Sequence, residues 1–142
     1  MSEATEETRS VVVERDFPHP PEKVWRALTE SSLLTQWLMR NDFAAEVGKT
    51  FQFRMDPMPQ WDGVIDCEVL VVEPMKRLSY TWRALGLDSV VLLTLTAAEN
   101  GTHLRMEHSG FRADQQQAYG GAKYGWKGFL DGLERLLDGG MR

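Results

Sequence analysis

The stretch QQQAYGGAKYGWKGFLDGLERLL, residues 115–137, is the longest helical pattern in the chain. At about 3.6 residues per turn, its large apolar residues fall on one broad face and its charged residues fall on the opposite face. The apolar face consists of Ala122, Trp126, Phe129, Leu130, Leu133, Leu136 and Leu137. The pattern predicts a helix that buries this face against a sheet and ends at Gly139-Gly140.

A stripe of glycines runs beside the apolar face of this predicted helix. The stripe is formed by Gly121, Gly125, Gly128 and Gly132. Each glycine inside a helix costs about 0.5–1 kcal/mol relative to alanine, so packing must hold the helix together. Two interpretations stay open: the stripe leaves room for a ligand or for movement of the helix, or it lets the helix backbone approach the sheet closely.

The chain before this helix predicts one strand, two short helices and then a series of strands. Residues 11–18 are β-branched and end at prolines, residues 20–30 and 31–37 carry short apolar stripes, and residues 43–108 alternate with a period of two. Two hairpin turns are expected, one at Gly48-Lys49 within residues 43–55 and one at Asn100-Gly101. We therefore predict an α+β fold, with a strongly curved antiparallel sheet of about six to seven strands wrapped around the C-terminal helix.

Several sequence segments of this chain resemble segments at corresponding positions in a known superfamily. They are PPEKVWRALTE at 20–30, LLTQW at 33–37, VEPMKRLSYTW at 72–82 and HSGF at 108–111, together with Trp126 and the leucines after it. Over residues 11–137 the chain resembles the START-like superfamily (SRPBCC, the helix-grip fold), in the branch related to the C-terminal domain of the heat-shock protein 90 ATPase activator. The resemblance implies a cavity between the sheet and the last helix that holds a small hydrophobic molecule.

Length and charge limit the function further. We expect residues 1–142 to form one domain with a tail at residues 1–8. The net charge is −5 and the sequence has no basic run, which argues against nucleic acid as a partner. No apolar stretch approaches the roughly 20 residues of a membrane span, and the acidic N-terminus does not look like a signal peptide, so we expect no membrane insertion and a cytoplasmic location.

Metal and cofactor sites are not indicated by the sequence. Cys67 is the single cysteine, and His19, His103 and His108 lack the spacing of a metal site. We therefore expect neither a metal nor a cofactor. Because Cys67 alternates with polar residues in a strand, it is expected as a small buried hydrophobe.

The inward positions of the strands and the last helix supply the candidate ligand-binding residues. Their aromatic rings and thioethers suit a flat or irregular apolar molecule, although the same residue types also form ordinary cores. The candidates are Trp37, Met39, Phe53, Met55, Trp61, Cys67, Tyr80, Trp82, Met106, His108, Trp126 and Phe129, with Met58 as a further residue at one end.

Three functions remain open. The first is a non-catalytic protein that binds or sequesters a small hydrophobic or aromatic ligand. The second is a cyclase-like or hydrolase-like enzyme in which His108 and Tyr80 would place or move protons. The third is an interaction module that associates with a chaperone or with a second copy of the chain. The sequence shows no nucleophile with a base at motif spacing and no phosphate loop, so we expect the first.

Overall fold

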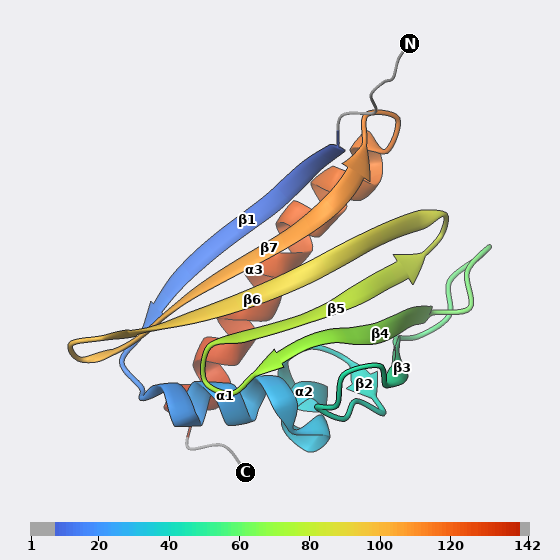
Figure 1. Cartoon of the computed structure of the whole chain (residues 1–142). Helices are drawn as coiled ribbons and strands as arrows, with labels where there is room; N and C mark the ends of the chain where they lie inside the picture. The colour runs from blue at the N-terminus through green and yellow to red at the C-terminus, as the bar shows by residue number, and fades with distance from the viewer. Residues whose placement is uncertain (1–7, 140–142) are drawn as a thin grey trace.

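The computed structural model describes residues 8–139, which form one antiparallel sheet and three helices (Figure 1). The sheet has seven strands in the order β1-β7-β6-β5-β4-β3-β2. The strands are β1 (Thr8–Phe17), β2 (Arg40–Asn41), β3 (Thr50–Arg54), β4 (Val64–Glu73), β5 (Arg77–Ala84), β6 (Leu87–Ala98) and β7 (Gly101–Arg112). The helices are α1 (Pro21–Thr29), α2 (Ser31–Trp37) and α3 (Gln116–Asp138).

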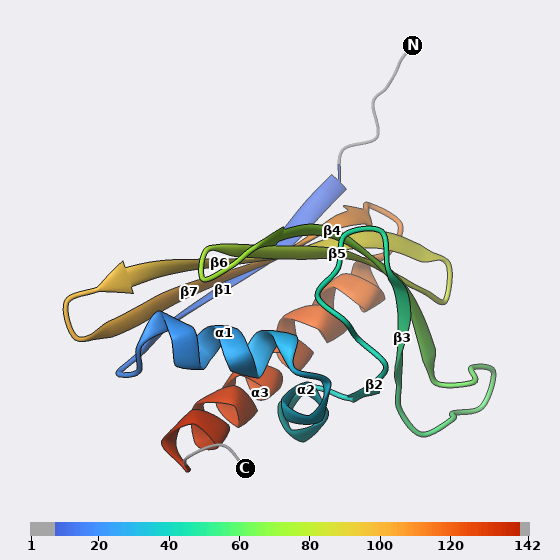
Figure 2. The same cartoon turned by 60° about the horizontal axis from the view of Figure 1, so that its bottom comes forward.

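The predicted α+β class and the wrapping of the sheet around the last helix are confirmed. Figure 2 shows α3 beneath the sheet, with α1 and α2 on the same side, while β2 and β3 turn down beside the helices. The expected tail at residues 1–8 falls mainly outside the described residues, and Thr8 is the first residue of β1. Within residues 8–139, no helix is both long enough and apolar enough to cross a membrane.

The C-terminal half of α3 is held by apolar packing and by polar contacts at its edges. Leu130, Leu133 and Leu137 are fully buried, as the helical pattern predicts. On one side, Arg15 of β1 forms an ion pair with Asp131 at 2.8 Å. These contacts fix the half of α3 that follows Trp126 and compensate for the weak helix propensity of its glycines.

The two short helices pack together at the end of α3. Trp37 of α2 donates its indole N–H to the carbonyl of Ala27 in α1, at 2.8 Å. In α1, Lys23 donates to the carbonyl of Leu137 at 2.7 Å, which satisfies one of the last carbonyls of α3. The first and last helices are therefore joined at the end of the molecule opposite the start of α3.

The prediction of a hairpin at Gly48-Lys49 was wrong. Residues 43–49 form no strand, and β3 pairs instead with β4 and with the two-residue β2. The physical reason lies in Phe43, whose N–H bonds to the side chain of Asn41 and whose ring packs edge-on against Phe51 at 5.0 Å. Phe43 in this segment is therefore part of the hydrophobic core rather than part of a strand.

The turn predicted at Asn100-Gly101 is displaced by one residue. Ala98 pairs with Gly101, so Glu99 and Asn100 form the turn and Gly101 begins β7. A Cβ at Gly101 would lie 2.0 Å from the carbonyl oxygen of Phe17, so glycine is needed there for close approach of two backbones.

Candidate functional site

A cavity of about 400 Å³ lies between the first half of α3 and the inner face of the sheet. Its floor is supplied by β4 to β7, and its other side by α3, the residue Met39 after α2, and the loop after β3. The lining residues are Met39, Met55, Met58, Trp61, Ile65, Trp82, Ala84, Leu85, Leu87, His108, Ala118, Gly121, Ala122, Gly125, Trp126 and Phe129. Among residues 8–139, the lining includes no Lys, Arg, Asp or Glu side chain.

The glycines of the α3 stripe differ in their surroundings. Gly121 and Gly125 line the cavity, so missing side chains there leave part of its space open. Gly132 lies beside α2, where an added Cβ would meet the backbone oxygen of Trp37 at 3.5 Å, an ordinary van der Waals distance, so the approach of α2 does not require glycine there. Gly128 has open space around it and lies outside the lining.

His108 lies at the floor of the cavity and is 1% exposed. The indole N–H of Trp126 donates to Nδ1 of His108 at 3.0 Å. Because an indole nitrogen can only donate, Nδ1 is the acceptor and the ring proton sits on Nε2. Nε2 therefore donates to Oγ of Ser89 at 2.8 Å, and this hydroxyl donates to the carbonyl of Trp82 at 2.7 Å.

The imidazole of His108 is neutral near pH 7 because it is buried. Burial lowers the pKa of His108 to about 4, well below its ordinary value. Protonation would also place an N–H where Nδ1 now accepts the bond from Trp126. Both ring nitrogens are thus engaged, and the arrangement orients side chains at the base of the cavity rather than presenting a free base to a substrate.

Most predicted site residues line the cavity, but five lie elsewhere in the core. Those brought together are Met39, Met55, Met58, Trp61, Trp82, His108, Trp126 and Phe129, whereas Trp37, Phe53, Cys67, Tyr80 and Met106 lie outside the lining. Phe53, Tyr80 and Met106 are fully buried. Phe53 lies between the rings of Tyr80 and Trp82, at 5.8 and 5.5 Å.

Tyr80 carries a buried polar atom that the fold leaves unsatisfied. Its hydroxyl has no hydrogen-bond partner within residues 8–139. Burial raises the pKa of this phenol far above its usual range. Its ring packs among Phe43, Phe51 and Phe53. This environment suits a core residue better than a proton donor to a ligand.

Sequence reasoning missed several lining residues. Ile65, Ala84, Leu85, Leu87, Ala118, Gly121, Ala122 and Gly125 complete the cavity. The alternation that placed Trp82 inward would have found Ala84 if it had been extended by two residues. Gly121 and Gly125 were signalled by the stripe. No sequence signal pointed to Leu85, which lies in a turn.

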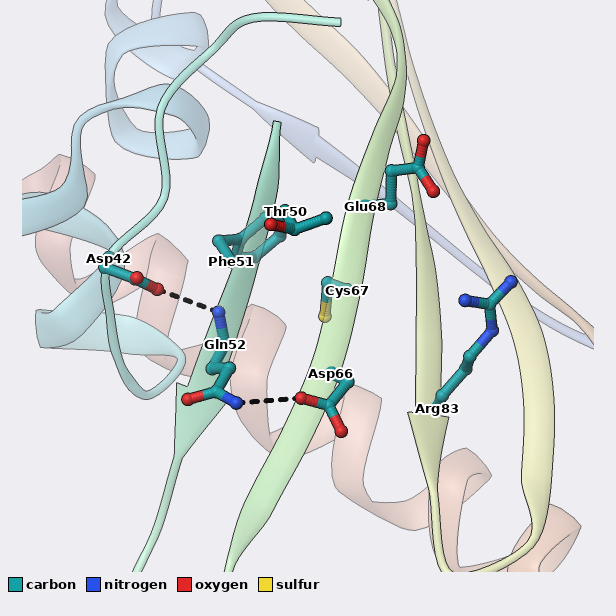
Figure 3. Close-up of a pocket in the computed structure, with 8 residues that line it drawn as sticks. All are labelled: Asp42, Thr50, Phe51, Gln52, Asp66, Cys67, Glu68 and Arg83. Atoms are coloured by element: carbon teal, nitrogen blue, oxygen red, sulfur yellow. Dashed lines mark hydrogen bonds between the residues drawn. The ribbon is translucent and has the colours of Figure 1, made fainter. Parts of the chain in front are cut away.

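A second hollow of about 320 Å³ lies on the other face of the sheet (Figure 3). Its polar groups largely bond to one another or to near neighbours: Gln52 donates to Asp66 at 2.8 Å, and Arg83 donates to Asp88 at 3.0 Å. Cys67 also borders it, and burial raises the pKa of that thiol to about 12. The hollow is part of a hydrogen-bonded outer surface, so the apolar cavity is the stronger candidate site.

Comparison with known proteins defines the family. Residues 18–138 match the family described as Activator of Hsp90 ATPase homolog 1-like protein. The chain belongs to this family. The match covers the two short helices, six of the sheet's strands and α3, and therefore includes the cavity. A search of curated proteins finds no match.

Several solved structures are similar to this chain in sequence and fold, and one of them is from Mesorhizobium loti. Protein MLL2253 from that organism is 56% identical over 94% of this chain and 100% of its own, with a TM-score of 0.88. DynU16, from the dynemicin biosynthetic locus, is 27% identical over 93% of this chain and 48% of its own, with a TM-score of 0.81. CalU16 from Micromonospora echinospora is 25% identical over 92% of this chain and 76% of its own, with a TM-score of 0.78.

The neutral state of His108 predicts a pH dependence of stability. In the unfolded chain the imidazole titrates near pH 6.5, so between about pH 6.5 and 4 only the unfolded state takes up the proton. As the pH is lowered through this window, the free energy of unfolding should therefore decrease, by up to about 3 kcal/mol from this group. Urea unfolding from pH 7.5 to 4.5 should show a smaller fall for His108→Gln than for the wild type.

His103 offers the control for this experiment. Hydrogen bonds that the His103 ring donates to the carboxylates of Asp16 and Glu14 raise the pKa of His103, so its contribution to stability is present at low pH and is lost as pH rises. His103→Gln should therefore make the fall toward acid steeper. Parallel curves for the wild type and His108→Gln would contradict the neutral assignment of His108.

The unsatisfied hydroxyl of Tyr80 gives a second prediction. Tyr80→Phe should leave the free energy of unfolding unchanged or raise it by up to about 1 kcal/mol, because a buried group without a partner is removed. Tyr119→Phe is the matched variant, since the Tyr119 hydroxyl donates to the carbonyl of Ser10 at 3.3 Å, and it should cost about 0.5–1 kcal/mol. A loss for Tyr80→Phe as large as that for Tyr119→Phe would show that the Tyr80 hydroxyl has a partner.

Proposed function

We propose that this protein binds an uncharged, largely apolar, ring-containing small molecule in the cavity beside α3 and releases it unchanged. The observation that carries the proposal is a cavity of about 400 Å³ with an apolar lining and a neutral, fully bonded histidine at its floor. Family membership and the likeness to DynU16, a protein of a biosynthetic locus, support a small molecule as the ligand.

The lining favours an uncharged ligand. An ionic group moved into an apolar cavity loses its hydration, and it needs a charged or strongly polar partner to compensate. The described lining offers no oppositely charged side chain. The neutral His108 already uses both ring nitrogens. A carboxylate, phosphate or ammonium group would therefore remain without a partner inside the cavity.

The shape and softness of the walls favour rings. Trp82, Trp126 and Phe129 supply flat surfaces against which a ring can stack. Met39 and Met55 supply flexible thioethers that adjust to an irregular outline. The volume lies toward the small end of the range for ligand pockets, so a molecule of two or three fused or linked rings fits better than a long lipid.

Catalysis through His108 and Tyr80 is less well supported by the geometry. The two ring nitrogens of His108 are occupied, and Tyr80 lies outside the cavity lining behind Phe53. A reaction in which these two side chains place or move protons would need them to reach the substrate. The role as a chaperone-associated or self-associating module stays a prediction.

Two fluorescent probes with nearly the same carbon skeleton test the proposal. N-phenyl-1-naphthylamine is neutral, whereas 8-anilinonaphthalene-1-sulfonate carries a sulfonate. We expect the neutral probe to bind at least about tenfold more tightly, to quench tryptophan fluorescence through Trp82 and Trp126, and to raise the unfolding free energy by about 2.7 kcal/mol at 100 times its dissociation constant. Absence of binding by the neutral probe, or tighter binding by the anionic one, would contradict the proposal.

Filling the cavity from the helix gives a variant test. Gly121→Leu places a side chain into the lining while replacing a helix-breaking residue, so we expect unfolding stability to rise by about 0.5–1 kcal/mol and probe affinity to fall at least about tenfold. Gly128→Leu is the matched control, because Gly128 also has open space around it but lies outside the lining. That variant should gain similar stability and keep wild-type affinity. Equal affinity in both variants would place the probe elsewhere.

A further inference from the structure

The turn between β5 and β6 has an unusual residue at its tip. Ala84 pairs with Leu87, which leaves Leu85 and Gly86 as a two-residue turn. Both have positive φ, at 55° and 80°, the signature of a type I′ turn. Asn, Asp or Gly is favoured at the first of these positions, because a branched side chain is strained in the left-handed region. Leucine at residue 85 therefore lowers the stability of the hairpin.

The strained leucine lies at the mouth of the cavity. Leu85 lines the cavity and is nevertheless 70% exposed, and Met58 is a second lining residue that is 50% exposed. The side chain of Gln115, at the start of α3, donates to the carbonyl of Gly86 at 3.3 Å and ties the turn to the helix. The turn therefore holds Leu85 beside the opening between the sheet and the first turns of α3.

We propose that Leu85 is a ligand-contacting residue that covers the outer end of the bound molecule and selects ligands that are apolar along their whole length. This inference rests on the proposed function. A ligand with a charged head would be expected to leave that head at the opening, where polar side chains could meet it. Here the opening presents Leu85 and Met58, so the outer end of the ligand gains by contact with apolar groups.

Met75 shows that strain alone does not identify such a residue. It lies in the turn between β4 and β5, at the other end of β5, with φ of 63° and a half-exposed apolar side chain. It does not belong to the cavity lining. Leu85 differs from Met75 in its place on the cavity, and this difference supplies a matched control.

The test compares Leu85→Asn with Met75→Asn in the full chain. Asparagine tolerates positive φ, so both variants should unfold at a temperature about 2–6 °C above the wild type. Leu85→Asn should weaken the binding of N-phenyl-1-naphthylamine about tenfold, measured by fluorescence titration, whereas Met75→Asn should bind as the wild type does. A loss of affinity in a Leu85→Asn variant that unfolds above the wild-type temperature would not come from unfolding.

Each other outcome has a distinct meaning. If Leu85→Asn binds the probe as tightly as the wild type does, the inference about Leu85 is overturned while the proposed function stands. If both variants lose affinity equally, the effect does not arise from contact at the mouth, and the inference is again overturned. If the wild type itself does not bind the probe, the proposed function fails and the inference falls with it.

Discussion

The hydrogen bond from Trp126 to His108, at 3.0 Å, joins α3 to the sheet at the point where the helix changes character. Beyond this bond toward the C-terminus, buried leucines such as Leu130 and Leu133 pack against the inside of the fold. Before it, Gly121 and Gly125 face a cavity. This buried contact therefore lies near the boundary between the part of the helix that lines the cavity, which extends to Phe129, and the part that packs through its leucines.

The same contact also sets the electrostatics of the cavity. An indole N–H can only donate, so it fixes the imidazole tautomer, which in turn directs its proton to Ser89 and, through that hydroxyl, to the carbonyl of Trp82. The chain of donors ends on a backbone acceptor and leaves the floor of the cavity neutral. The histidine that the strand pattern marked as a candidate base therefore has both ring nitrogens bonded within the fold.

Sequence periodicity predicted most of the elements and the inward faces of β3, β4, β5 and β7, but it missed β2 and found only part of the cavity. Alternation placed Trp82 and His108 inward correctly, and it placed Phe53 and Tyr80 inward as well. Alternation predicts which face of the sheet a side chain lies on. It does not predict whether that part of the strand lies opposite α3. Because α3 packs mainly against β1 and β7 and meets β5 at Trp82, the position of an inward residue along its strand decides whether it contacts the helix, the core or the cavity. Leu85 escaped prediction because turns carry no alternation.

The cavity combines several local departures from maximum stability. Glycine in a helix and leucine at positive φ each lower stability, yet Gly128 and Met75 show that neither feature marks a site by itself. What distinguishes Gly121 and Leu85 is that they border the same hollow. The lining also comes from strand ends, one helix edge and loops, whereas the leucine packing that holds α3 lies elsewhere. The exposed members of the lining, such as Gly121 and Leu85, carry little of the packing, whereas Trp126 and His108 join the helix to the sheet. We therefore expect the family fold to fix the architecture and the exposed lining residues to decide which ligand the proposed site accepts.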